Sequence, residues 1–229
     1  MRRAPLVRVV TLVLCLFLVT SCGSAADLAV GGSRSGAATE VPGLTVDGGV
    51  VVSSDDLDTE AAEASDPIPV VVYVEPLCPH CKAFDAEHGS MLQERLEGGQ
   101  ITLEYRLVSF LDNGTTERSS ARAVNAALCA ATDAGPAAYA TYVHELLENQ
   151  PVGGVLTDAA LVALGDDAGA SIESCVTGES HADLVASLSK NALGKISATP
   201  TVIVGGREFE GVPTAEDLVA ALGSGSAVV

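Results

Sequence analysis

Two cysteines, Cys78 and Cys81, are separated only by Pro79 and His80 in a chain of 229 residues. This C-x-x-C spacing occurs in redox pairs, zinc sites, haem attachment sites and structural disulfides. A zinc site needs about four ligands, and the sequence offers no second C-x-x-C or close histidine pair. A c-type haem requires histidine directly after the second cysteine, where Lys82 stands. A redox-active pair fits best, an inert disulfide remains the alternative, and we predict neither a bound metal nor a cofactor.

The segments around the pair explain why it would react. A β-branched apolar run at 70–74 predicts a strand buried on both faces, and the pair then opens a helix that extends to about Leu96. Free backbone N–H groups and the helix dipole would stabilise a thiolate at Cys78. Pro79 suits the first helical position. Cys81 lies one turn further in, where we expect it to be more buried and to resolve a mixed disulfide.

The remaining pattern places this strand and helix in an α/β core. A second strand is predicted at 101–108, which completes a βαβ unit with a right-handed crossover. Residues 117–195 are rich in Ala and Leu with helical periodicity. Strands at 201–204 and 207–211 and a final helix at 214–223 follow. The order predicts an α/β core with an inserted helical subdomain.

At this point the sequence resembles the DsbA-like branch of the thioredoxin superfamily. Three features carry the resemblance: a strand leading directly into Cys-Pro-His-Cys, the helical insertion after the βαβ unit, and Thr199-Pro200 directly before a strand. The match covers roughly residues 66–223 and implies a thioredoxin fold with an inserted helical subdomain.

The resemblance implies a role for each matched position. Cys78 would attack and form the mixed disulfide, Cys81 would resolve it, and His80 would stabilise the thiolate. Pro200 would be cis and packed against the disulfide, while the Thr199 backbone would pair with an extended substrate segment.

One position departs from the family pattern. Many members carry a buried acid six residues before the first cysteine, used to move protons for the second thiol, and that position is Val72 here. The nearest acid is Glu75, three residues before Cys78. Glu75 would either substitute for the missing acid through water or simply face solvent.

Four other cysteines complete the set of six. Cys15 lies in an apolar segment near the N-terminus and Cys22 closely follows it, which leaves Cys129 and Cys175. An even number of cysteines in an exported domain suggests disulfides. The short spacing of the first pair leaves Cys129 to join Cys175, either as a structural staple between helices or as a second redox relay.

The N-terminus has the pattern of an export signal. Three arginines precede the apolar run Val9–Val19, which has the length of a signal-peptide core rather than of a membrane span. The segment 19–22, Val-Thr-Ser-Cys, resembles the bacterial lipobox. Cleavage before Cys22 with lipidation of its sulfur would anchor the chain to the outer face of the bacterial cytoplasmic membrane. Ordinary signal cleavage nearby is the alternative.

The strongly acidic composition, with a formal net charge of −18, argues against nucleic-acid binding. With one active site and no second dimerisation element, we expect a monomer, and its substrates would be exported proteins with cysteine thiols. The resemblance implies a membrane partner, DsbB-like or VKOR-like, that re-oxidises it.

We divide the chain into segments by composition and predicted elements: a signal peptide at 1–21, lipid anchor and tether at 22–40, edge strand and acidic connector at 41–65, two halves of the thioredoxin fold at 66–116 and 196–223, the helical insertion at 117–195, and a tail at 224–229.

The predicted function is donation of the Cys78–Cys81 disulfide to exported proteins. A reductase or isomerase of the same fold is the first alternative. A peptide-binding lipoprotein with a structural disulfide is the second, and thiol-dependent metal handling the third. His88, His144 and His181 stand alone in the sequence and are predicted to be surface or helix-packing residues.

Overall fold

The structure, a computed structural model, describes residues 40–57, 66–153 and 155–223. The predicted signal peptide, Cys22 with its tether, the tail and most of the acidic connector lie outside the described residues. Among the described helices, none is both long and apolar enough to cross a membrane.

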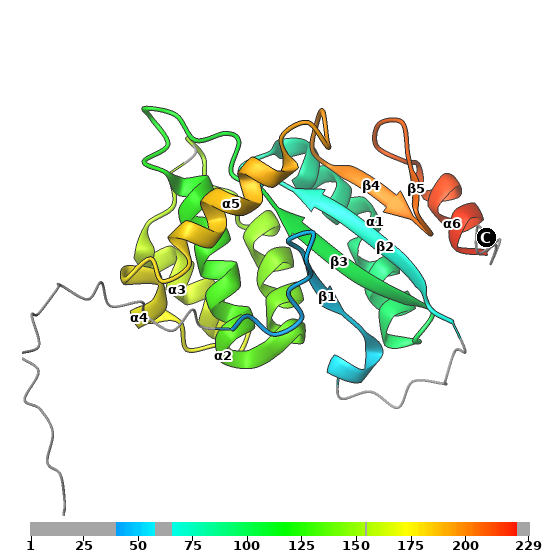
Figure 1. Cartoon of the computed structure of the whole chain (residues 1–229), viewed down its shortest axis with the longest axis horizontal. Helices are drawn as coiled ribbons and strands as arrows, with labels where there is room; N and C mark the ends of the chain where they lie inside the picture. The colour runs from blue at the N-terminus through cyan, green and yellow to red at the C-terminus, as the bar shows by residue number, and fades with distance from the viewer. Residues whose placement is uncertain (1–39, 58–65, 154, 224–229) are drawn as a thin grey trace, which may run out of the picture. The chain divides into compact units, whose positions relative to one another are not determined.

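The core is a five-stranded sheet with the order β1-β3-β2-β4-β5 (Figure 1). The strands are β1 (Val50–Val52), β2 (Ile68–Val74), β3 (Ile101–Leu107), β4 (Thr201–Val204) and β5 (Arg207–Glu208). β2 pairs parallel with β3 and antiparallel with β4, so the strand that leads to the cysteine pair is central. The predicted edge strand is confirmed as β1, which pairs antiparallel with β3.

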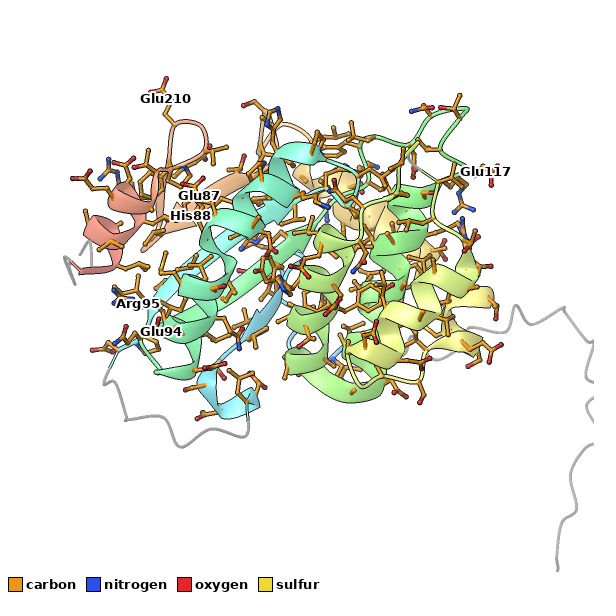
Figure 2. The ribbon with its side chains drawn as sticks, turned by 180° about the vertical axis from the view of Figure 1, so that it is seen from behind. Glu87, His88, Glu94, Arg95, Glu117 and Glu210 are labelled. Carbon is orange, nitrogen blue, oxygen red and sulfur yellow. A yellow bond between two sulfur atoms is a disulfide. The ribbon has the colours of Figure 1, made fainter. Side chains whose placement is uncertain are left out.

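The βαβ unit is closed by α1 (Pro79–Glu97), which lies across one face of the sheet (Figure 2). Its buried side includes Phe84, Leu92 and Leu96, at the near-helical spacing expected of a helix packed on a sheet. Gly98 and Gly99 follow its last residue. The helix therefore begins and ends close to where the sequence predicts.

The helical insertion comprises α2 (Ser119–Glu148), α3 (Asp158–Asp167), α4 (Glu173–Thr177) and α5 (Ala182–Ala192). Figure 1 shows these helices gathered beside the β1 and β3 side of the sheet, opposite α6 (Ala215–Gly223). α2 is interrupted at Gly135, which has a φ of 86° and is followed by Pro136. A residue before proline avoids the helical region, and glycine tolerates positive φ.

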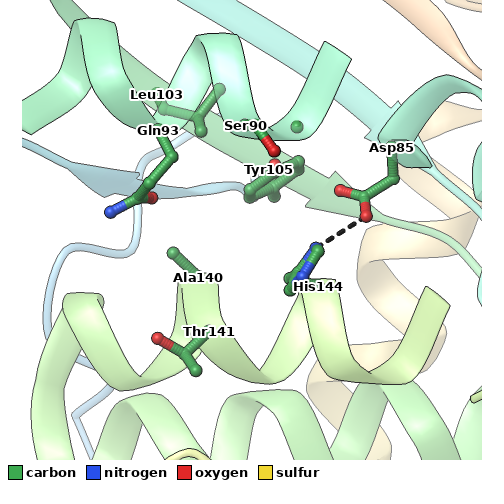
Figure 3. Close-up of a pocket in the computed structure, with 9 residues that line it drawn as sticks. Asp85, Ser90, Gln93, Leu103, Tyr105, Ala140, Thr141 and His144 are labelled. Atoms are coloured by element: carbon green, nitrogen blue, oxygen red, sulfur yellow. Dashed lines mark hydrogen bonds and ion pairs between the residues drawn. The ribbon is translucent and has the colours of Figure 1, made fainter. Parts of the chain in front are cut away.

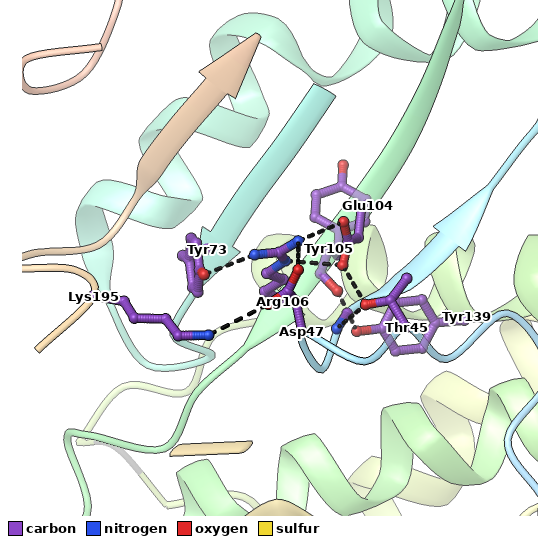
Figure 4. Close-up of polar contacts among 9 residues, drawn as sticks. Thr45, Asp47, Tyr73, Glu104, Tyr105, Arg106, Tyr139 and Lys195 are labelled. Atoms are coloured by element: carbon purple, nitrogen blue, oxygen red, sulfur yellow. Dashed lines mark hydrogen bonds and ion pairs between the residues drawn. The ribbon is translucent and has the colours of Figure 1, made fainter. Parts of the chain in front are cut away.

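Polar contacts hold the segment before β1 on the sheet (Figure 4). The Arg106 guanidinium donates to both oxygens of Glu104, at 2.8 and 2.9 Å, and to the Tyr73 hydroxyl at 2.9 Å. Thr45 donates to Glu104 at 2.7 Å, and Asp47 lies 3.5 Å from Arg106. Because Glu104 and Arg106 are largely buried, mutual pairing offsets the cost of removing their charges from water.

Candidate active site

Cys78 sits at the junction between the sheet and α1. Its backbone is extended, with φ −76° and ψ 117°, and it forms the N-cap of the helix, with Pro79 at the first helical position. The Cys78 N–H donates to the Glu75 carbonyl at 3.0 Å, which closes the turn after β2. Cys78 and Cys81 are free thiols, 7% and 0% exposed. The turn therefore presents one sulfur at the edge of the protein and encloses the other.

The environment of Cys78 favours its thiolate. Hydrogen bonds from the Cys81 thiol, from the Thr199 side chain and from the backbone N–H groups of Cys81 and His80 outweigh burial and lower the pKa of Cys78 to about 5. The N–H groups are unpaired because they belong to the first turn of α1. Cys78 is thus a nucleophile and also a good leaving group at neutral pH.

The environment of Cys81 has the opposite effect. Its hydrogen bond to Cys78 and its burial raise the pKa of Cys81. The Glu75 backbone N–H contacts its sulfur at 3.5 Å. The two thiols therefore differ in acidity although they lie one helical turn apart.

A distant loop completes the site. The Thr199–Pro200 peptide bond is cis, and the Thr199 carbonyl lies 3.3 Å from the Cys78 sulfur. Residues 121 positions apart in the chain thereby meet at one point. Pro200 is buried and directly precedes β4, whose pairing with β2 fixes the loop beside α1.

The two polar side chains next to the cysteines point outward. His80 is exposed, and its imidazole makes no hydrogen bond to the part of the chain that the structure describes. Its contribution to the acidity of Cys78 comes through the backbone N–H. Lys82 donates to the Glu148 carbonyl at 2.7 Å, so it connects α1 to the end of α2.

Glu75 is the residue whose importance the sequence understates. It is 1% exposed, so the prediction that it simply faces solvent is wrong. Its carboxylate accepts hydrogen bonds from the Ser120 hydroxyl and, at 2.8 Å, from the Leu77 N–H. Burial raises the pKa of Glu75 to about 7, although these two hydrogen bonds lower it. The signal in the sequence for a buried Glu75 was its position directly after a predicted buried strand. Val72, the position of the family's acid, is a fully buried apolar residue.

A second residue that sequence reasoning missed comes from the insertion. The Gln150 side-chain amide donates to the Pro76 and Cys78 carbonyls, at 2.9 Å each. These two hydrogen bonds connect the insertion to the turn that leads from β2 to Cys78. No local pattern marks Gln150, because its partners lie more than 70 residues away.

The remaining cysteines form a separate feature. A disulfide joins Cys129 in α2 to Cys175 in α4, with the two Cα atoms 5.9 Å apart. His181 lies close to both sulfurs, and within residues 40–57, 66–153 and 155–223 these three side chains are the one group that could together hold a metal. Sulfurs joined in a disulfide offer no thiolate ligand.

The three histidines differ in their surroundings. His88 is fully buried and packs on the Phe84 ring, with centroids 4.9 Å apart, as the helix-packing prediction requires. His181 is buried and lies 3.1 Å from the Thr132 hydroxyl. His144 does not stand alone: its Nδ1 lies 2.7 Å from the Asp85 carboxylate.

Comparisons with known proteins agree with this geometry. Residues 61–224 match the family model described as Thioredoxin. DsbA of Mycobacterium tuberculosis, in its oxidised crystal structure, superposes with a TM-score of 0.66 at 28% identity, over 77% of this chain and 91% of that one. MdbA of Corynebacterium diphtheriae, a thiol–disulfide oxidoreductase, shares the fold with a TM-score of 0.58 at 22% identity, over 74% and 87% of the two chains.

A curated relative has a different domain composition. The serine/threonine-protein kinase PknE of Mycobacterium tuberculosis is 31% identical over 124 residues, which is 52% of this chain. The match spans only 22% of the kinase's length. The likeness therefore concerns a portion of that protein.

Proposed function

Since the chain belongs to the thioredoxin family and is a DsbA-like thiol–disulfide oxidoreductase with a helical insertion in its fold, we propose that it oxidises exported proteins by donating a Cys78–Cys81 disulfide. The observation that carries the proposal is the unequal acidity of the two thiols. The pKa of Cys78 is lowered to about 5, and that of Cys81 is raised. A dithiol that contains a stable thiolate favours the reduced form, so its disulfide is a strong oxidant.

The magnitude of this effect can be estimated. At pH 7, lowering the pKa of Cys78 from 9.0 to about 5 stabilises the dithiol by about 3 kcal/mol. For a two-electron couple this raises the reduction potential by about 60 mV. The pair would thus be more oxidising than the same pair without thiolate stabilisation.

The reaction proceeds by two exchanges. A substrate thiolate attacks the Cys78 sulfur of the disulfide, and the sulfur–sulfur bond breaks with its electron pair on Cys81. A second substrate thiolate attacks the substrate sulfur of this mixed disulfide and releases Cys78 as a thiolate. The substrate loses two electrons and gains a disulfide, while the protein gains the two electrons.

Glu75 would supply the proton that Cys81 needs as it leaves. Its pKa of about 7 lets the carboxyl group hold or release a proton at neutral pH. Its backbone N–H contacts the Cys81 sulfur, and its carboxylate is enclosed with Ser120. Thr199 would offer its backbone to an extended substrate segment beside the mixed disulfide, with Pro200 holding the loop.

The setting of this activity is also a proposal. A signal peptide at 1–21 and a lipid on Cys22 would place the domain on the outer face of the bacterial cytoplasmic membrane. A monomer would there meet exported thiol proteins and a DsbB-like or VKOR-like oxidant in the membrane. A Cys22→Ala variant would then leave the membrane fraction, whereas retention of the variant there would contradict the anchor.

The test is the equilibrium reduction potential of the cysteine pair in glutathione buffers, together with the pH profile of Cys78 alkylation. A potential well above that of the glutathione couple and an alkylation midpoint near pH 5 support the oxidase. A potential well below that couple identifies a reductase. Slow alkylation at pH 6 would show an inert pair and favour the peptide-binding alternative.

A further inference from the structure

A cavity of about 200 Å³ lies between α1, α2 and β3, outside the cysteine site. Figure 3 shows residues from these three elements around one space. Its floor is largely apolar, formed by Leu103, the Tyr105 ring and Ala140. Polar groups surround that floor: Asp85, Ser90, Gln93, Thr141 and His144.

The carboxylate of Asp85 is the most unusual group in this cavity. The residue is only 5% exposed. One of its oxygens, Oδ2, is fixed by His144 Nδ1 at 2.7 Å. The other oxygen accepts no hydrogen bond from any group in the described part of the chain. An unpaired carboxylate oxygen of a buried residue, facing a cavity, is a site for a hydrogen-bond donor.

Gly89 keeps that oxygen accessible. It lies in the middle of α1, where glycine is less favourable than alanine, and it has no positive φ that would call for glycine. A Cβ atom at this position would lie 3.1 Å from Asp85 Oδ1, a tight contact to which the carboxylate would have to adjust. The missing side chain therefore leaves room for the carboxylate and for a group that would bind to it.

The hydroxyl of Tyr105 is a second polar group of this cavity. Tyr105 is 5% exposed and lines the cavity. Its hydroxyl makes no hydrogen bond within residues 40–57, 66–153 and 155–223. Burial and the nearby Asp85 carboxylate raise the pKa of Tyr105, so the phenol stays neutral. The cavity thus offers a carboxylate oxygen and a phenol hydroxyl above an apolar floor.

The charge of the surroundings decides the class of ligand. The His144 ring lies between two acids, with Nδ1 2.7 Å from Asp85 and Nε2 3.8 Å from Glu148. Even with the imidazole protonated, two carboxylates face one cation. A cationic group that donates hydrogen bonds complements such a site, whereas an anion is repelled.

We propose that this cavity is a binding site for a small organic cation, a primary amine or amidine with a compact apolar body, held by Asp85. The amine would donate to Asp85 Oδ1 and to the Tyr105 oxygen. Its apolar body would cover Leu103 and Ala140. The site is independent of the proposed redox function, because the cysteines contribute none of the lining groups.

The probe is benzylamine, titrated into the full-length ¹⁵N-labelled protein and followed by NMR. We expect saturable shifts of the Gly89, Ser90 and Thr141 amides with a Kd near 1 mM or below, the range for a ligand of this size. Benzyl alcohol, which has the same shape without the charge, should bind at least about tenfold more weakly.

Variants separate the site from general electrostatics. Asp85→Asn keeps the shape and should weaken benzylamine binding at least about tenfold. Gly89→Ala should weaken it about threefold or more by crowding Asp85, while favouring the helix. Glu94→Gln removes an exposed acid from the same helix and should change the Kd less than about twofold. Any of three results would overturn the proposal: no saturation up to about 10 mM, equal binding of benzyl alcohol, or unchanged binding in Asp85→Asn.

Discussion

The chain holds two cysteine pairs in its described part, and their surroundings differ. Cys78 caps the start of α1, where unpaired N–H groups lower its pKa to about 5. Cys129 lies in the interior of α2, where the backbone N–H groups are used within the helix, and it is joined to Cys175. Position along a helix thus separates a pair suited to exchange from a pair suited to crosslinking.

The largest expected effect is on disulfide transfer. Cys78→Ser should reduce transfer to a model dithiol peptide by about three orders of magnitude or more, because the attacked sulfur is lost. Cys81→Ser also lacks the donor disulfide, but when it is given the oxidised, disulfide-bonded peptide its Cys78 thiolate should attack that disulfide and accumulate a mixed disulfide, because the variant has no second thiol to release it. A transfer rate within about tenfold of wild type in Cys78→Ser would show that the chemistry lies elsewhere.

The second pair should affect stability and not transfer. Cys129→Ser/Cys175→Ser opens a loop of 46 residues, which should lower the free energy of unfolding by about 4 kcal/mol in the chain-entropy account of disulfides. Urea unfolding measures this change. The transfer rate and the reduction potential of the first pair should stay unchanged. A loss of transfer like that of Cys78→Ser would instead favour a redox relay through Cys129 and Cys175.

These two regions also show which parts of the structure can be predicted from the sequence. The strand–turn–helix around Cys78 was predictable because its signals are local: a β-branched run, proline at the first helical position and glycines at the end. The α/β fold with its insertion followed from the order of such segments and from the resemblance. In both cases, neighbouring residues carry the information.

What the sequence understated depends on contacts between distant segments. Glu75 is buried, and its carboxylate accepts a hydrogen bond from Ser120, 45 residues later. Gln150 reaches the Cys78 carbonyl from the end of the insertion. Asp85 meets His144 only because α2 packs on α1. Hydrophobic periodicity fixes which faces are buried, but it does not specify which polar side chains meet across them.

A smaller effect is expected at Glu75. The folded protein holds this proton up to about pH 7, whereas the unfolded chain releases it near pH 4.5. Folding therefore takes up a proton between these values, and the contribution of Glu75 to stability falls as the pH rises through that window. Glu75→Gln has no titrating group here, so its stability should not fall with pH in this window. Its single amide oxygen replaces two carboxylate oxygens, so one of the donors, Ser120 or Leu77, loses its acceptor.

Glu75→Gln should consequently be about 1–2 kcal/mol more stable than wild type at pH 8 and equally or less stable at pH 4. Unfolding in urea at the two pH values measures the difference. The rate at which Cys81 is released in single-turnover exchange should also be lower in the variant. Its pH profile should lose the step near pH 7 that the titration of Glu75 causes. An unchanged pH profile would remove Glu75 from the proton transfer.

The smallest effect is expected at His80. Substitution of this residue tests whether the His80 side chain or the backbone N–H groups stabilise the Cys78 thiolate. Because the imidazole is exposed and the backbone N–H is retained in His80→Ala, this variant should raise the pKa of Cys78 by less than about one unit, or about 1.4 kcal/mol. Thiolate absorbance in the ultraviolet measures the pKa, and Lys82→Ala is the matched control, since it removes an exposed cation from the same turn. A rise of about two units or more in His80→Ala alone would make the imidazole the main stabiliser. The difference between the two cysteine pairs would then rest on that side chain more than on the helix N-terminus.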